Sequence, residues 1–336
     1  MIEQSQQLLL AIFGYVGFDY DLQTLDDEFN SNKNELTRAL HTYLGTGLTL
    51  IQLPKIIGRI YLSLNLEYRR AQSIIDRYLQ NMIEQELRQT PAVRVERKRI
   101  SLISSLVASL QEDEKLEEKK SEEDKKGLSQ AEVIGEMLSF LSAGFSTTST
   151  ALAWFIFLMS KHPHVQNKLK KELAEYNYQR LSMEQLESLI YLDCVFRELL
   201  RFVPPALGTL RTLVADDQLP STGAYLSKGD QVAIPFYNIH RDQRYCLGPM
   251  DPEQFHPERY LIDDNNDNSK IAFLTFGGGH RQCLGQDFAR LELKAIFARI
   301  MQHVTFGDGG PILNAGGYKQ TDTILPKHIG VTIILD

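Results

Sequence analysis

The stretch FGGGHRQCLG, Phe276 to Gly285, holds one of the three cysteines in this 336-residue chain. Three glycines precede Cys283, and Arg281 stands two residues before it. The residues from Leu284 to Val304 have a helical pattern, so Cys283 is predicted at the start of a helix. Unpaired backbone N–H groups and the positive end of the helix dipole favour a thiolate there. A thiolate is a nucleophile or a metal ligand, and neighbouring glycines let the backbone approach a large flat cofactor.

Composition excludes several classes of protein. Hydrophobic residues make up 43% of the chain and charged residues 24%, as in an ordinary globular protein. The net charge of -7 gives no basic excess for nucleic acid, so no nucleic-acid partner is expected. An odd number of cysteines argues against a disulfide scaffold, and no second Cys/His pair completes a zinc site.

Hydrophobic periodicity predicts a mainly α protein with a minor β part in the C-terminal half. Residues 42–60 are interrupted by glycines and a proline, which predicts a loop or short helices there. Ser182 and Gln185 form a candidate capping box. The remaining predictions are helices over most of 1–110, over 66–89, 131–163 and 191–202, and extended segments at 231–240 and 328–336.

Residues 112–127 are almost entirely charged, which predicts a solvated linker or, alternatively, an electrostatic docking arm. The apolar run near the N-terminus lacks a basic flank, and the run Ala151–Met159 is short. The sequence therefore predicts no signal peptide and no membrane anchor in this chain.

The cysteine stretch resembles the haem-binding signature of the cytochrome P450 superfamily. The matching residues are Phe276, Gly279, Arg281, Cys283 and Gly285. The resemblance implies that the cofactor is haem b (iron protoporphyrin IX), with Cys283 as the axial thiolate of its iron. It also implies that the bidentate cation of Arg281 binds a haem propionate. A core cysteine beside a glycine turn is the structural alternative.

Two further segments agree with this resemblance. Glu198 and Arg201 lie in FRELLR at a helical i, i+3 spacing, and Arg259 lies in the later segment PERY. The family joins such residues in a buried network, which here would be structural. A surface ion pair between Glu198 and Arg201 is the alternative reading.

The segment AGFSTTS resembles the family's distal-helix stretch, through Ala143, Gly144, Thr147 and Thr148. The resemblance implies that Thr147 hydrogen-bonds the oxygen species; a hydroxyl bonded to the preceding turn is the alternative. Ser146 stands where the family usually has an acid, and a serine relays a proton but does not supply one at low pKa.

The remaining site residues are assigned by position in the family. Arg211 is placed like a second propionate-binding arginine, with a simply exposed arginine as the alternative. His240 faces a propionate or is a structural histidine. The expected substrate contacts are Ala143, Phe145, Leu207, Gly208 and Thr209, in a mostly apolar pocket.

The resemblance covers nearly all of this chain, whereas the family's first sheet, early helices and W-x-x-x-R motif have no counterpart. Trp154 is the only tryptophan and lies in the helix predicted over 131–163, which contains the distal-helix stretch. We therefore expect residues 1–336 to form a single haem-binding domain that is N-terminally incomplete and binds haem weakly or not at all. The full-length parent is expected at the endoplasmic reticulum membrane.

The leading hypothesis is a haem-thiolate monooxygenase that uses O2 and an apolar small-molecule substrate. An NADPH-dependent reductase would supply electrons, because no flavin or nicotinamide motif is present. One alternative is a relative that rearranges peroxides or dehydrates oximes without O2, and another is a non-catalytic fragment that retains the motifs. A cysteine hydrolase that uses Cys283 is a further alternative. It is disfavoured because Glu198, Arg201 and Arg259 have no role in hydrolase chemistry.

Overall fold

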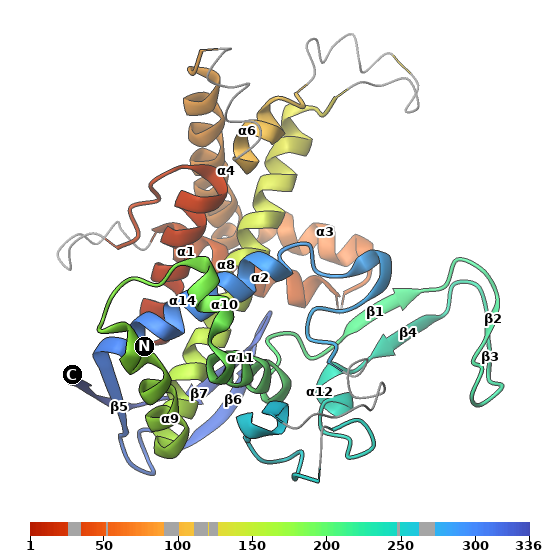
Figure 1. Ribbon diagram of the computed structural model, residues 1–336. Helices are drawn as coiled ribbons and strands as arrows, with labels where there is room; N and C mark the ends of the chain where they lie inside the picture. Colours follow the sequence, from red (N-terminus) through yellow and green to blue (C-terminus); the bar gives the residue numbers. More distant parts are fainter. Residues whose placement is uncertain are drawn as a thin grey trace. The chain divides into compact units, whose positions relative to one another are not determined.

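The computed structural model describes residues 1–25, 35–51, 53–90, 101–110, 120, 127–246, 249–261 and 273–336 (Figure 1). The chain divides into two compact units. Residues 2–149 form the first, called here the helical unit, and residues 150–336 with Met1 form the second, called the mixed unit. The expected charged linker, 112–127, lies outside the described residues except at positions 120 and 127.

The helical unit contains only helices among its described elements. They are α1 (Ile2–Phe18), α2 (Glu35–Ile51), α3 (Lys55–Leu64), α4 (Leu66–Leu87), α6 (Leu102–Val107) and the first part of α8 (Gln130–Lys161). Helix α2 packs along α4, which begins where the Asn65 side chain accepts a hydrogen bond from the N–H of Tyr68. Ile75, Leu79 and Ile83 form its buried stripe at helical spacing.

The prediction that glycines interrupt residues 42–60 was wrong in part. Helix α2 continues through Gly45 and Gly47, and the chain leaves the helix only before Pro54. A glycine inside a helix costs only about 1 kcal/mol, which the packing of α2 along α4 offsets. Proline has no N–H to continue the ladder of hydrogen bonds, so the helix ends there and α3 starts anew.

The long helix predicted over 131–163 is α8, which runs through both units. It is the one described helix long and apolar enough to cross a membrane, but 72% of its most apolar window is buried inside the protein. Phe155 on this helix stacks on Phe297 with ring centroids 3.9 Å apart. Its burial is that of a core helix.

The mixed unit combines helices with small antiparallel sheets and therefore confirms a mainly α fold with a minor β part. Its helices after α8 are α9 (Pro163–Leu173), α10 (Met183–Ser188), α11 (Ile190–Phe202), α12 (Phe236–Ile239) and α14 (Gln286–His303). Its 3₁₀ helices are η1 (Ala174–Tyr176), η2 (Pro257–Leu261) and η3 (Gly279–Arg281).

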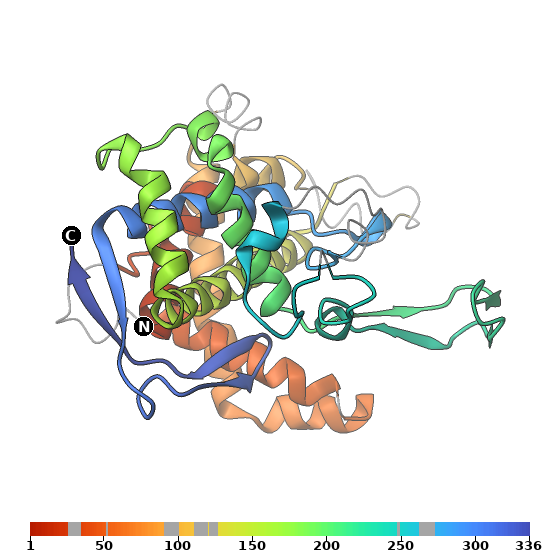
Figure 2. The ribbon, with the colours of Figure 1, turned by 60° about the horizontal axis from the view of Figure 1, so that its bottom comes forward.

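Its strands pair in twos: β1 (Thr209–Thr212) with β4 (Gln231–Ile234), β2 (Asp217–Gln218) with β3 (Tyr225–Leu226), β5 (Val304–Asp308) with β8 (Val331–Leu335), and β6 (Gly316–Gln320) with β7 (Ile324–His328). The first four strands form a long ribbon beyond α12 (Figure 2). The extended segment expected over 231–240 ends at Pro235, after which α12 begins.

Local signals explain where the helices of the mixed unit begin. Ser182 and Gln185 form the predicted capping box at the start of α10. The carboxylate of Glu172 accepts hydrogen bonds from the backbone N–H groups of Tyr191 and Leu192, which caps α11. Helix α11 packs against both η2 and α14 and thus links the segments that hold the candidate site.

Candidate functional site

The cysteine loop, defined here as residues 273–285, leads into the N-terminus of α14. Gly277 and Gly279 have φ angles of 72° and 66°, in the left-handed region that a side chain would strain. The Gly277 N–H donates to the Leu274 carbonyl at 2.7 Å, and the Cys283 N–H donates to the Phe276 carbonyl at 2.8 Å. Hydrogen bonds between backbone groups of the loop itself therefore stabilise its turns.

The cysteine loop presents its functional side chains to solvent. Cys283 is exposed and free, and its loop ends at Gly285, the N-cap residue of α14. Arg281 is exposed, and within the described residues its guanidinium has no hydrogen bond or ion pair. The loop therefore holds a thiol and an uncommitted bidentate cation two residues apart.

Behind helix α11, three charged side chains form an ionic cluster: Glu198, Arg201 and Arg259. Their exposed fractions are 0%, 4% and 0%. Arg201 donates two hydrogen bonds to the carboxylate, at 2.8 and 2.9 Å, and Nε of Arg259 lies 3.0 Å from the same carboxylate. The backbone N–H of His256 also donates to Glu198. Every charge in this cluster thus has an opposite charge beside it, as buried charges require.

Arg201 also ties separate segments together. Its Nη1 donates to the carbonyls of His240 and Pro252, and its Nη2 donates to the carbonyl of Gln254. Burial lowers the pKa of Arg201, but the hydrogen bond and charge of Glu198 outweigh that effect and raise it. The guanidinium therefore stays charged while it holds three backbone carbonyls in place.

His240 is 3% exposed, and its Nε2 accepts a hydrogen bond from the N–H of Leu274 at 3.0 Å. Its Nδ1 has no hydrogen-bond partner among the described residues. Burial lowers the pKa of His240 to about 4, with the nearby charge of Arg201 acting in the same direction. The imidazole is therefore neutral at pH 7, with its proton on Nδ1.

Arg211 lies on β1, where its Nη1 donates to the Thr209 hydroxyl and to the Leu210 carbonyl. Leu207 and Gly208 precede this strand, and both are half-buried. A Cβ on Gly208 would lie 2.4 Å from the Ile234 carbonyl oxygen, so glycine is required for the close approach to β4. Of the predicted substrate contacts Leu207, Gly208 and Thr209, only Leu207 has a fully apolar side chain.

The distal-helix residues lie on the part of α8 within the helical unit. The Thr147 hydroxyl donates to the Ala143 carbonyl at 2.8 Å, and Ser146 is 8% exposed. Phe145 is fully buried and packs edge to face on His41, with ring centroids 5.8 Å apart. Two residues span about 200° around a helix, so Phe145 points away from the face that Ala143 and Thr147 share.

Gly144 has a packing role that its sequence motif did not reveal. A Cβ at this position would lie 2.3 Å from the ring of Phe13 on α1. The glycine therefore admits an aromatic ring of a neighbouring helix rather than leaving open space on the Thr147 face.

Sequence reasoning missed two contacts. Arg259 donates to the sulfur of Cys246 at 3.0 Å, although nothing in the sequence pairs these residues. Lys294, with 2% of its side chain exposed, lies 3.3 Å from Asp193, which also pairs with Arg197 and Arg290. The i, i+4 spacing of Asp193 and Arg197 was the only available signal.

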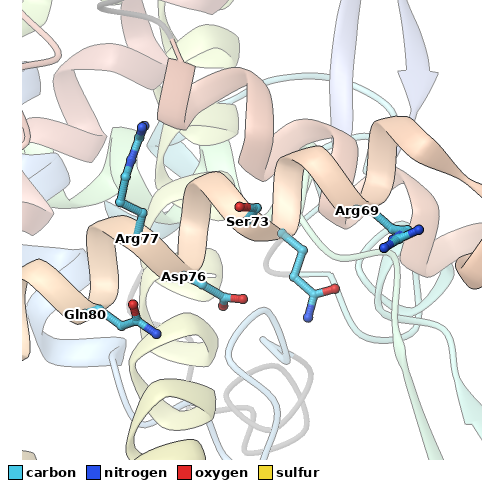
Figure 3. Close-up of a pocket in the computed structure, with 6 residues that line it drawn as sticks. Arg69, Ser73, Asp76, Arg77 and Gln80 are labelled. Atoms are coloured by element: carbon cyan, nitrogen blue, oxygen red, sulfur yellow. The ribbon is translucent and has the colours of Figure 1, made fainter.

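One polar groove of about 390 Å³ lies elsewhere, along a single face of α4 in the helical unit (Figure 3). Arg77 leaves it to pair with Glu35. The lining residues are Arg69, Gln72, Ser73, Asp76, Arg77 and Gln80. The groove shares no residue with the predicted site, and its polar lining does not fit an apolar substrate.

A comparison with known protein families identifies the family of this chain. The family model described as cytochrome P450 matches residues 5–311. The chain belongs to the cytochrome P450 family. Among similar proteins, cytochrome P450 4V2 of Rattus norvegicus is 35% identical over 54% of this chain and 34% of its own length. Cytochrome P450 9e2 of Blattella germanica is 39% identical over 51% and 32%. Cytochrome P450 3A13 of Mus musculus is 34% identical over 55% and 36%. The chain thus spans about a third of the length of the curated relatives it matches.

Cytochromes P450 bind haem, and the cysteine loop fits that group. The exposed thiol of Cys283 is a soft ligand suited to iron, and the loop has no side chain at Gly277, Gly278 or Gly279 to block a flat ring. The uncommitted guanidinium of Arg281 suits a carboxylate such as a propionate. In Arg211, by contrast, one amino group is already committed to its own strand.

Proposed function

We propose that this chain carries the haem-thiolate centre of a monooxygenase that inserts one oxygen atom from O2 into an apolar organic substrate. The observation that carries the proposal is the cysteine loop: a family signature folded so that the thiol of Cys283 is free and exposed. Haem b, when bound, supplies the iron at which oxygen is activated. Cys283 would hold the iron through its thiolate, and Arg281 would pair with a propionate.

The ionic cluster supports this function without touching the reacting atoms. Arg201 holds the carbonyl of His240, and Thr275 of the cysteine loop donates to the Leu200 carbonyl on α11. The cluster holds His240, and Thr275 ties the cysteine loop directly to α11. Preorganising a ligand in this way lowers the entropy cost of binding iron.

Proton handling is assigned to Thr147 with Ser146. The Thr147 hydroxyl proton is held by the Ala143 carbonyl, so its Oγ1 would be left to accept a hydrogen bond at the site of oxygen activation. Ser146 passes protons onward through water, because its hydroxyl is both donor and acceptor. A serine at this position, rather than an acid, also favours a second candidate function: peroxide rearrangement or dehydration without O2. Turnover driven by a peroxide in the absence of any reductase would distinguish that activity.

The substrate contacts are assigned to Ala143, Leu207, Gly208 and Thr209. Phe145 belongs to the packing of α8 rather than to this set, because its ring is buried against His41. The electron donor is a separate NADPH-dependent reductase. By its resemblance to microsomal relatives, the protein is assigned to the endoplasmic reticulum membrane.

A carbon monoxide difference spectrum of the reduced chain, expressed with haem supplied, tests the proposal. We expect the Soret band typical of thiolate-ligated haem, and its loss in Cys283→Ser. Cys194→Ala is the matched control, because that cysteine is buried in α11 and free. A wild-type band typical of histidine or neutral thiol ligation, or a thiolate band that survives Cys283→Ser, would overturn the assignment.

A further inference from the structure

We propose that His240 is the positioning residue of the cysteine loop. Its imidazole links the ionic cluster on α11 to the backbone turn from which Cys283 is presented. The inference rests on the proposed function only where haem ligation is the readout, because the same link is measurable in the protein without haem.

The link begins at the ionic cluster. Nη1 of Arg201 donates to the His240 carbonyl at 2.8 Å, which fixes the backbone at the end of α12. His240 then accepts the N–H of Leu274 on Nε2 at 3.0 Å. One residue therefore receives a hydrogen bond from the buried cation on its backbone and another from the loop on its side chain.

The loop carries the link forward through its own backbone. The Leu274 carbonyl accepts the N–H of Gly277, which has a left-handed φ angle of 72°. The Phe276 carbonyl in turn accepts the N–H of Cys283. The amide of Leu274 is thus the point at which a side chain outside the loop determines where its first turn starts. Thr275, bonded to the Leu200 carbonyl, is the second such tether.

The surroundings of the imidazole fix both its orientation and its charge. The ring lies nearly parallel to those of Phe236 and Phe273, at interplanar angles of 19° and 13°. Burial and the neighbouring charges of Arg201 and Arg241 favour the neutral form, although a contact between the imidazole and the backbone of Arg201 opposes them. Only a neutral ring with its proton on Nδ1 leaves Nε2 free to accept from Leu274. The hydrogen bond from Leu274 therefore selects the tautomer, the positive neighbours favour the neutral ring, and the neighbouring aromatic rings restrict its orientation.

Substitutions at this position separate the hydrogen bond from the packing. His240→Phe keeps an aromatic ring between Phe236 and Phe273 but removes the acceptor. His240→Gln loses the ring, but its side-chain oxygen reaches about as far as Nε2 and accepts the same N–H. His162→Phe is the matched control, because His162 is also packed on an aromatic ring, that of Phe255, and within the described residues makes no hydrogen bond or ring contact with the cysteine loop.

Two measurements apply to each variant: amide hydrogen exchange at Leu274 and Gly277 without haem, and the thiolate fraction of bound haem in the carbon monoxide spectrum. For His240→Phe we expect the exchange rate at Leu274 to rise about tenfold over the wild type. This rise should be in addition to any increase caused by a loss of global stability. We also expect a smaller thiolate fraction. His240→Gln should restore most of both properties, and His162→Phe should match the wild type.

Unchanged exchange at Leu274 in His240→Phe, or equal losses in the phenylalanine and glutamine variants, would overturn the proposal. If the phenylalanine variant does not fold, His240→Asn replaces it, because the shorter amide falls short of Leu274. Equal exchange in the asparagine and glutamine variants would then overturn it. If the wild type binds no haem through a thiolate, the proposed function fails, but the exchange measurement still decides the role of His240.

Discussion

Glu198 on α11 and Glu292 on α14 are two carboxyl groups of the mixed unit, buried to similar depth but in opposite surroundings. Their exposed fractions are 0% and 7%. Glu198 lies between two guanidinium groups and also accepts a backbone N–H. Neither carboxyl oxygen of Glu292 has a hydrogen-bond partner among the described residues. Burial alone raises the pKa of Glu292 to about 8.

The comparison shows that burial does not decide the state of a carboxyl group; its partners do. Removing an ion from water costs several kcal/mol, and only opposite charges and hydrogen bonds offset that cost. Where they are missing, the group keeps its proton instead. The first carboxylate binds cations and connects α11 to η2, whereas the second is a neutral acid that the fold tolerates.

The largest effect is expected at Glu198. Glu198→Ala leaves Arg201 and Arg259 buried without an anion, which should lower the free energy of unfolding by about 3–5 kcal/mol. Urea unfolding followed by circular dichroism measures the change. Glu253→Gln is the control, because Glu253 pairs with Arg241 but 63% of its side chain is exposed. A loss at Glu198 no larger than at Glu253 would contradict the view that the cluster is a stabilising ionic unit.

The second effect is expected at Glu292 and depends on pH. Because its folded-state pKa is near 8 and its ordinary value is 4.5, the folded chain keeps a proton that the unfolded chain loses. Stability should therefore fall as pH rises between these values, by about 3 kcal/mol from pH 5 to pH 7, and this contribution should level off above pH 8. Glu292→Gln should remove that slope and stabilise the protein at pH 7.

Urea unfolding at pH 5, 6, 7 and 8 would measure the slope for the wild type and for Glu292→Gln. The exposed Glu253→Gln variant should retain the wild-type slope. Parallel curves for the wild type and Glu292→Gln would mean that Glu292 is ionised and partnered in solution, and the contrast with Glu198 would then disappear.

The two carboxyl groups also show how far the sequence could lead. The i, i+3 spacing of Glu198 and Arg201 made their pairing predictable, because helical geometry is local. Arg259 was expected only through a family resemblance, since no local rule brings residue 259 to α11. Glu292 gave no signal at all, because a charged residue within an amphipathic helix is normally assigned to the exposed face.

The same distinction applies to the fold and to the loop. Capping boxes and prolines act locally, so the start of α10 and the end of α2 agree with their sequence signals. The continuation of α2 through Gly45 depends on its packing against α4, which is tertiary. The hydrogen bond from Leu274 to His240 joins residues 34 positions apart, and no periodicity connects them. The sequence therefore indicated a glycine turn before Cys283, but it did not indicate that His240 contacts the start of that turn.

Asp193 tests the intermediate case between the two carboxyl groups, because it is partly exposed and faces an excess of cations. Its side chain is 17% exposed and lies within 3.3 Å of the buried Lys294 ammonium. Burial lowers the pKa of Lys294, and the charge of Asp193 opposes that effect. Asp193→Asn should therefore lower the pKa of Lys294 further.

Asp193→Asn should also lower the free energy of unfolding by about 1–3 kcal/mol, because the asparagine oxygen still accepts a hydrogen bond and solvent reaches part of the site. Urea unfolding at pH 7 measures this loss, and Glu84→Gln, which disrupts only the exposed pair with Arg88, is the control. If the two variants lose equally little, solvent screens Asp193 as fully as it screens Glu84. Partial exposure to solvent would then be enough to make the loss of a charged partner nearly free of cost.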